Sequence, residues 1–209
     1  MTIFAEGFTE TPYWWEAAPP EAGLPHSELK DADVLVIGSG YAGLNAAITL
    51  GRAGAAVAVL DSQLLGEGAS SRNGGQVRSS PKQSEAELTR RYGREIAHGI
   101  LADFEASDDF LRKRIAESGI SCHLEWHGAF IGAHTIRDFE SLAARHAQLP
   151  LERQAEGRLV PPSELGTEIR TRIYKGGYVV REAGQLHPAL YHAGLRRVAR
   201  AHGVQLFSH

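Results

Sequence analysis

The sequence predicts an α/β fold with a parallel sheet, because one segment alternates two apolar runs with a helical pattern. Residues 34–37 (Val-Leu-Val-Ile) are a continuous β-branched run without polar alternation, which is typical of a strand buried on both faces. Residues 42–53 show a helical pattern with small side chains, and Gly54 is placed to cap its end. A second buried strand is predicted over 55–60 and is closed by Asp61. These elements make one β-α-β unit, for which we expect a right-handed crossover.

A loop and a long helix follow this unit. Residues 62–83 are rich in glycine and serine and predict a loop with one helical turn. Residues 84–118 carry apolar side chains at steps of three and four, which predicts a helix. Gly93 and Gly99 are candidate interruptions of that helix, and Gly119 is its predicted end.

The remaining elements are shorter. Residues 121–126 and 129–133 predict two strands joined across His127 and Gly128. The last predicted elements are a helix over 135–156, short pieces over 158–187 with a strand at 178–180, a helix over 188–202 that begins at Pro188, and a buried strand over 204–207.

Composition places the chain among globular proteins and excludes several functions. Of the 209 residues, 43% are hydrophobic and 22% are charged, and the net charge is −3. We therefore expect no binding to nucleic acid and no attraction to an anionic membrane. No apolar run is long enough to span a bilayer. The single cysteine, Cys122, excludes an internal disulfide and fits a reducing cytosol, so we expect a cytoplasmic protein.

Two further side-chain groups invite functional hypotheses that we reject. Cys122 and His123 are adjacent on a predicted strand and would point to opposite faces, so we predict no metal site. Cys122 itself is interpreted as a buried apolar side chain rather than a nucleophile. The basic cluster at 112–114 alternates with acids on a helical face, and we expect it to be solvated.

The motif that carries chemistry is a G-x-G-x-x-G sequence between the first strand and the first helix. Gly38 permits the tight turn, Gly40 lets a pyrophosphate approach the backbone, and Gly43 lets the helix pack closely on the strand. The helix start offers free N–H groups and a positive dipole end to phosphates. Asp61, at the end of the second strand, is placed to accept hydrogen bonds from a ribose. The pattern predicts a Rossmann-like dinucleotide-binding domain.

A second segment rich in glycine and serine, residues 66–76, follows the acidic strand end. Two phosphate-binding segments suit a long, extended cofactor such as FAD, whereas a nicotinamide enzyme would not need the second. The candidate cofactor-binding residues are Gly38, Ser39, Gly40, Tyr41, Ala42, Gly43, Asp61, Ser62, Ser70, Ser71, Arg72, Asn73, Gly74, Gly75 and Gln76.

Residues 34–77 resemble the N-terminus of the D-amino-acid-oxidase-like FAD-dependent oxidoreductases. The G-A-S-x-R-N-G-G-Q stretch at 68–76 is most similar to the γ-glutamylputrescine oxidase branch, as is the tail at 12–14. Residues 184–188 are similar to a G-x-l-x-P segment of the family. The sequence departs from the family at Asp61, where glutamate is common. It also departs at Ser71, where glycine is frequent, so a left-handed backbone there would be strained.

The resemblance implies roles for the candidate residues. Gly38, Ser39, Gly40, Ala42 and Gly43 would line the pyrophosphate, and Asp61 would hold the ribose. Ser70 and residues 72–76 would follow the path from the pyrophosphate to the isoalloxazine ring. The implied activity is oxidation of a C–N bond in a small amine or amino acid by hydride transfer to the flavin. No catalytic residue is identified, and the electron acceptor and oligomeric state stay open.

The resemblance also implies a division of the chain. Residues 1–30 are an irregular tail whose aromatic cluster (Tyr13, Trp14 and Trp15) is expected to lie against the domain. Residues 31–83 are the first part of an FAD-binding domain. Residues 84–180 are a helical and strand segment towards a substrate domain, which interrupts the first domain, and residues 181–209 return to it. Because the chain ends two residues after an apolar strand, we expect an N-terminal fragment of a longer protein.

Two alternatives to a flavin enzyme remain at this point. The first is an NAD(P)-dependent dehydrogenase, which would share the first β-α-β unit but would not need the segment at 66–76. The second is an inactive, truncated nucleotide-binding fragment. Whether the protein retains a cofactor distinguishes the inactive fragment from the dehydrogenase.

Overall fold

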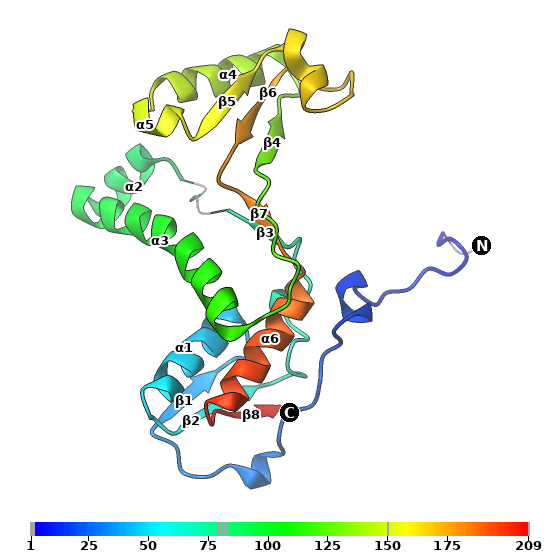
Figure 1. Ribbon diagram of the computed structural model, residues 1–209, viewed down its shortest axis with the longest axis vertical. Coiled ribbons are helices and arrows are strands. Elements are labelled where there is room, and N and C mark those ends of the chain that lie inside the picture. The colour runs from blue at the N-terminus through cyan, green and yellow to red at the C-terminus, as the bar shows by residue number, and fades with distance from the viewer. Residues whose placement is uncertain (1–2, 79–80, 82, 150, 209) are drawn as a thin grey trace. The chain divides into compact units, whose positions relative to one another are not determined.

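The computed structural model describes residues 3–78, 81, 83–149 and 151–208, and the chain forms two compact units (Figure 1). The first unit comprises Met1–Gly75, Leu111–Leu124 and Leu186–His209. The second comprises Gln76–Phe110 and Glu125–Gln185. Each unit is described separately below.

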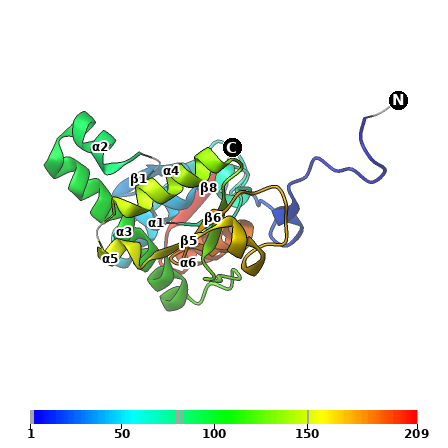
Figure 2. The ribbon, with the colours of Figure 1, turned by 90° about the horizontal axis from the view of Figure 1, so that it is seen from above.

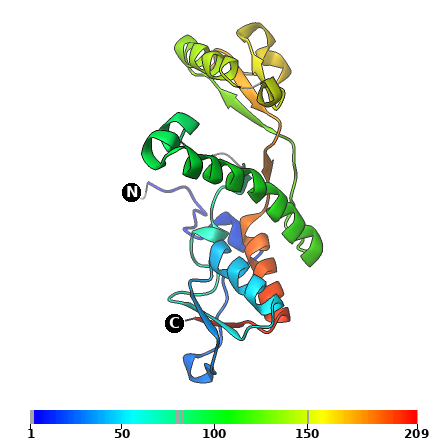
Figure 3. The same ribbon diagram turned by 90° about the vertical axis from the view of Figure 1, so that its left-hand side faces the viewer.

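The first unit contains a parallel sheet in the order β1-β2-β8. Its strands are β1 (Val34–Ile37), β2 (Val57–Asp61) and β8 (Gln205–Ser208), and its helices are α1 (Tyr41–Arg52) and α6 (Pro188–Ala201). β1 is followed by α1 and then by β2, its parallel neighbour, which confirms the predicted β-α-β unit. α1 and α6 lie side by side (Figures 1 and 3). The largest apolar side chains sealed in this core are Leu44, Ile48, Leu65, Leu195, Leu206 and Phe207.

The local signals within this unit are accurate to about two residues. β1 has the predicted bounds, α1 begins one residue early, and β2 begins two residues late and includes Asp61. Gly54 follows α1 with a φ of +91°, a conformation that glycine adopts without strain. α6 begins at Pro188, as predicted.

The prediction that β1 is buried on both faces is wrong. Leu35 is 52% exposed and Ile37 is 77% exposed, while Val34 and Val36 on the opposite face are only partly exposed. β1 is an edge strand, and α1 packs against it on one face. A run of four apolar residues does not reveal how many faces of a strand are covered.

The first unit also contains short 3₁₀ helices in its connecting segments. These are η1 (Tyr13–Glu16), η2 (His26–Glu28) and η3 (Ala69–Ser71). η3 is the single helical turn predicted within 62–83, although residues 79, 80 and 82 of that range lie outside the described residues.

The second unit is built on an antiparallel sheet in the order β4-β6-β5. The strands are β4 (Ala129–Gly132), β5 (Gly157–Val160) and β6 (Gly177–Val180), and β3 (Gln76–Val77) pairs separately with β7 (Gly184–Gln185). The helices are α2 (Glu85–Tyr92), α3 (Arg94–Ser118), α4 (Ile136–Ala147), α5 (Leu151–Gln154) and η4 (Pro162–Thr167). α4 packs beside β5 and β6 (Figure 2). The part of α3 from Leu111 onward belongs to the first unit.

Glycines decide how the long helical segment is divided. Gly93 has a φ of +84° and separates α2 from α3, whereas Gly99 lies inside α3 without interrupting it. Gly119, with a φ of +56°, follows the last residue of α3 as predicted. The helix expected over 135–156 is two helices, α4 and α5, and residue 150 between them lies outside the described residues.

The predicted pair of strands at 121–126 and 129–133 does not form. His123 has a φ of +52°, which is incompatible with an extended strand, and only Glu125 makes an isolated bridge, to Gln185. The strand at 129–132 does form, but it pairs with β6 rather than with the preceding segment. The sequence patterns do not predict strands β3, β5 and β7.

Candidate functional site

The Gly-rich turn between β1 and α1 requires glycine for steric reasons. Gly38 has a φ of +94° and donates its N–H to the Leu60 carbonyl at 2.7 Å. A Cβ on Gly43 would lie 2.1 Å from the Gly38 oxygen. A Cβ on Gly40 would lie 3.1 Å from Ser70 Oγ. The first glycine thus makes the turn, and the last lets α1 begin directly against it.

Ser39 and Asp61 join this turn to the end of β2. Asp61 Oδ2 accepts hydrogen bonds from Ser39 N (2.8 Å) and Ser39 Oγ (2.6 Å), while Oδ1 accepts from Gln63 N (3.1 Å). Burial raises the pKa of Asp61, but these hydrogen bonds outweigh it and hold the pKa below its usual value. Asp61 is therefore an ionised acceptor at neutral pH. Its Oδ1 accepts one hydrogen bond from the protein, whereas Oδ2 accepts two. Ser62, the next residue, is exposed.

The second Gly- and Ser-rich segment lies against the start of α1. Ser70 Oγ accepts the N–H of Tyr41, the first residue of the helix, at 3.1 Å. Asn73 donates to Tyr41 Oη at 3.3 Å and accepts from Gly75 N at 2.8 Å. Burial raises the pKa of Tyr41 to about 12, so its hydroxyl stays protonated. Residues from the two predicted segments therefore meet in one place.

Ser71 is a structural residue of this segment. It is 3% exposed, donates to the Gly66 carbonyl and accepts from Trp15 Nε1 at 2.8 Å. Among the described residues other than glycine, only His123 has a positive φ, so the expected left-handed strain at Ser71 is absent. Trp14 Nε1 donates to the Asn73 carbonyl at 2.8 Å. Both tryptophans of the tail thus pack on this segment, as predicted, whereas Tyr13 is 71% exposed.

The remaining candidates differ in their surroundings. Gly75 has a φ of +70°, and a Cβ there would lie 2.2 Å from the Leu186 oxygen, so this glycine allows two chain segments to cross. Nothing lies within 4 Å of a Cβ built on Gly74. Arg72 is exposed. Gln76 lies on β3 in the second unit.

These features fit the adenosine and pyrophosphate part of a dinucleotide. The first N–H groups of α1 have no partners within the helix, and the partial positive charge of its N-terminus favours phosphate. Gly40 leaves the approach free of a Cβ, and the ionised Asp61 stands at the end of the neighbouring strand. The residues present therefore suit the cofactor that the sequence predicts.

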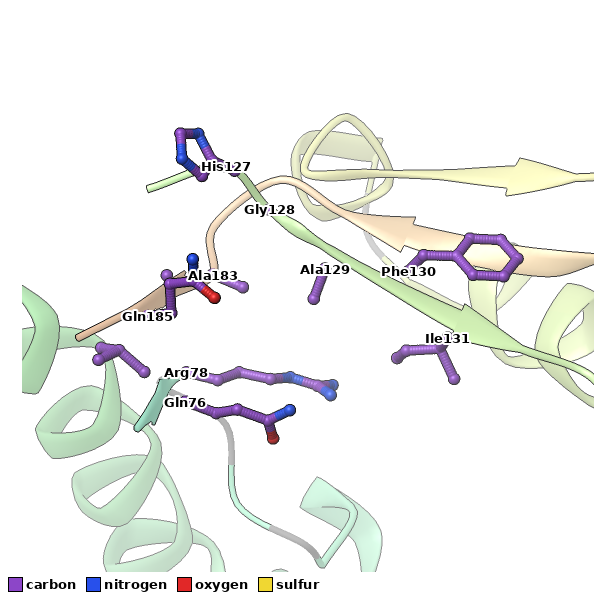
Figure 4. Close-up of a pocket in the computed structure, with 11 residues that line it drawn as sticks. Gln76, Arg78, His127, Gly128, Ala129, Phe130, Ile131, Ala183 and Gln185 are labelled. Atoms are coloured by element: carbon purple, nitrogen blue, oxygen red, sulfur yellow. The ribbon is translucent and has the colours of Figure 1, made fainter. Parts of the chain in front are cut away.

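A pocket of about 280 Å³ lies within the second unit (Figure 4). Gln76, on β3, and Arg78, directly after β3, extend in the same direction. Ala129 and Ile131 share the facing side of β4, while the Phe130 ring packs 6.0 Å from Tyr174. The described lining residues are Gln76, Val77, Arg78, His127, Gly128, Ala129, Phe130, Ile131, Ala183, Gly184 and Gln185.

Two lining side chains of this pocket are held by the same carboxylate. Glu125 Oε2 lies 3.0 Å from Gln185 Nε2, which donates to it, and 3.2 Å from His127 Nε2. Arg78 is the permanent cation among the described lining residues, which include no carboxylate. Of these residues only Gln76 is a candidate site residue from the sequence, because the pocket depends on the long-range pairing of β3 with β7 and of β4 with β6.

Arg114 corrects the expectation that the basic cluster at 112–114 is solvated. Its side chain is 5% exposed. Arg114 Nε donates to Asn45 Oδ1 at 3.0 Å, and a terminal nitrogen donates to Thr49 Oγ1 at 3.3 Å. Asn45 in turn donates to the Tyr41 carbonyl in the first turn of α1 at 2.9 Å. The sequence of the basic cluster at 112–114 does not indicate that Arg114 is the buried member.

The other reactive groups have structural environments. Cys122 is 1% exposed, and burial raises the pKa of its thiol, which disfavours the reactive thiolate. His187 caps α6 by accepting the Leu190 N–H at 3.2 Å. Within the described part of the chain, no group of three potential ligands could hold a metal ion. None of the helices described has the length and apolarity needed to cross a membrane.

Comparison with known proteins assigns the chain to a family. The model of the DAO family, described as FAD dependent oxidoreductase, matches residues 33–209. The chain is 29% identical over 183 residues to "Probable oxidoreductase OrdL" of Haemophilus influenzae, which covers 88% of this chain and 42% of that protein. It is 27% identical over 207 residues to gamma-glutamylputrescine oxidoreductase of Escherichia coli, covering 95% and 47%.

A solved structure agrees with the fold. Glycine oxidase of Geobacillus kaustophilus superposes with a TM-score of 0.62 at 22% identity, covering 85% of this chain and 46% of that one. The chain spans less than half the length of each of these three relatives. The family match extends over most of the chain and includes the Gly-rich turn, Asp61 and the segment at 66–76. The chain therefore belongs to the DAO family of FAD-dependent oxidoreductases.

Proposed function

We propose that this chain serves an enzyme that oxidises a C–N bond of an amine or an amino acid. When bound, FAD would accept the hydride from the carbon next to nitrogen, and the protein would supply binding and orientation. The similarity to a gamma-glutamylputrescine oxidoreductase and to a glycine oxidase supports this choice, since both names contain nitrogen compounds.

In this proposal the residues of the first unit hold the cofactor. The N–H groups of Gly40, Ala42 and Gly43 face the pyrophosphate, and Asp61 accepts from a ribose hydroxyl through Oδ1 because Ser39 engages Oδ2. The other residues proposed to line the cofactor are Gly38, Ser39, Tyr41, Ser62, Ser70, Ser71, Arg72, Asn73, Gly74, Gly75 and Gln76. Of these, Ser71 acts by supporting the segment, because its hydroxyl is already used within the protein.

One observation carries the proposal: the 3.1 Å hydrogen bond from Tyr41 N to Ser70 Oγ. It fixes the second Gly- and Ser-rich segment at the N-terminus of α1, where we propose that the pyrophosphate binds. A nicotinamide enzyme would not need that segment, so the arrangement favours FAD over NAD(P).

The pocket of the second unit supports a substrate with an anionic end. Arg78 offers a permanent positive charge, Gln76 offers an amide, and the side of β4 with Ala129 and Ile131 offers an apolar wall. A guanidinium binds a carboxylate with two parallel hydrogen bonds. We therefore propose that an amine with a carboxylate group binds better than the corresponding simple amine.

A spectrum followed by a paired substrate comparison tests the proposal. The purified protein should be yellow and release FAD, and amine oxidation should bleach it anaerobically. Arg78→Met should raise KM for a carboxylate-bearing amine by roughly tenfold and leave a simple amine unchanged. Arg170→Met, an exposed arginine that is not among the lining residues, is the matched control. A protein that binds NAD instead of FAD, or that is reduced only by a substrate without nitrogen, contradicts the proposal.

A further inference from the structure

Helix α6 carries two charged or titratable side chains that the cofactor site described above does not explain. His192 is 1% exposed and Arg196 is 4% exposed. They lie four residues apart, so they share one face of the helix. Burying such groups is costly unless they are hydrogen-bonded, and each of them contacts a loop of the candidate FAD site.

His192 holds the Gly-rich turn. Its Nε2 lies 2.7 Å from the Ser39 carbonyl oxygen. A carbonyl oxygen can only accept, so Nε2 must carry a hydrogen. Ser39 is 1% exposed, and its N–H and hydroxyl both donate to Asp61. The N–H and hydroxyl of Ser39 are therefore held by Asp61, and its carbonyl is held by His192.

The contact with Ser39 sets the direction of the next N–H group. In a trans peptide the carbonyl and the following N–H point in opposite directions, and the chain contains no cis peptide bond among its described residues. Because His192 takes the Ser39 carbonyl, the Gly40 N–H points away from α6. That N–H is one of those proposed to face the pyrophosphate.

Arg196 holds the second loop. One of its terminal nitrogens donates to the Leu65 carbonyl, and its Nε lies 3.8 Å from Glu21 Oε1. The next residue, Gly66, has a φ of +95°, and a Cβ there would lie 3.0 Å from His192 Nδ1 and 3.4 Å from Arg196. Gly66 accepts from Ser71, which links this loop to the segment at 69–71.

We propose that His192 and Arg196 are positioning residues that pre-form the FAD site by fixing its two loops from α6. The proposal rests on the assignment of these loops to FAD, which is part of the proposed function. The charged groups around His192 are Asp61, Arg196 and Glu21, and the Tyr41 ring lies 6.3 Å away.

Hydrogen–deuterium exchange of the protein without FAD tests the proposal independently of activity. His192→Leu keeps a similar volume but has no donor, so exchange at residues 38–41 should speed up by about tenfold. His192→Gln can place an amide N–H near the position of Nε2 and should restore most of the protection. Arg196→Met should loosen residues 65–71 instead. Val198→Ala, a buried change elsewhere on α6, should lower Tm without changing exchange in either loop.

FAD affinity should follow the same pattern. His192→Leu should weaken FAD binding by about tenfold and His192→Gln by about threefold or less, with Val198→Ala unchanged. The proposal is overturned if His192→Leu leaves the turn protected, or if His192→Gln is as damaging as His192→Leu. Should His192→Leu fail to fold, nitrogen NMR of the wild-type imidazole decides, because a hydrogen on Nδ1 alone would refute the contact. A protein without amine oxidase activity that shows the expected exchange pattern contradicts the proposed function and keeps this inference.

Discussion

Replacing Gly43 by alanine tests the claim that α1 starts in direct contact with the Gly-rich turn. The added Cβ would lie 2.1 Å from the Gly38 oxygen. Real Cβ atoms essentially never lie closer than 3.0 Å to another heavy atom, so the helix and the turn must separate by about 1 Å. The contact is with backbone, and no side chain can rotate out of the way. Val36 adds a second obstacle, at 3.2 Å from the same Cβ.

This separation should be costly. Overpacking of this kind costs roughly 1–3 kcal/mol, which for a chain of this size lowers Tm by roughly 2–12 °C. The matched control is Gly68→Ala, since no atom lies within 4 Å of a Cβ built there and its φ of −73° suits alanine. Thermal unfolding by circular dichroism measures both variants. If Gly43→Ala unfolds at the same temperature as Gly68→Ala and the wild type, the close contact between helix and turn does not exist.

Three further predictions address the site and its support. Gly40→Val should abolish FAD retention, because the valine Cβ would lie 3.1 Å from Ser70 Oγ and its methyl groups would block the pyrophosphate. Normal flavin absorbance in the purified variant would contradict this prediction. Arg114→Met should destabilise the protein by about 1–3 kcal/mol in urea unfolding, since two hydrogen-bonded partners on α1 lose a charged donor, whereas Lys113→Met should have little effect. The free energy of unfolding should fall as the pH drops below about 6.5, because burial lowers the pKa of His192 and the unfolded chain then binds more protons than the folded one. His192→Gln should reduce this pH dependence in urea titrations.

The sequence predicts the part of the fold that depends on residues close together in the chain. The β-α-β unit needs only short apolar runs, a helical period and glycines at fixed offsets, and all of these are neighbours in sequence. The glycines at 38, 43 and 54 are accurate markers because each one solves a local steric problem. The same locality explains why the helix at 188–201 was placed within one residue.

The errors share a physical cause, which is dependence on distant partners. The segment at 121–126 has the composition of a strand, but His123 has a φ of +52° and Glu125 bridges to Gln185, which is distant in sequence. The exposure of Leu35 and Ile37 depends on what covers each face of the sheet, and the sequence does not record that. Arg114 is buried because Asn45 and Thr49 lie opposite it, far away in sequence.

Ser39 shows how far a motif can understate a site. In G-x-G-x-x-G its position is written as x, as if any side chain would serve. In this chain the N–H, the hydroxyl and the carbonyl of that residue are all hydrogen-bonded, to Asp61 and to His192. Asp61 therefore holds the turn through Oδ2, and we propose that Oδ1 accepts from a ribose hydroxyl. A glycine motif defines where a phosphate can approach, whereas the residues around it decide whether the turn is already in the right shape when the cofactor arrives.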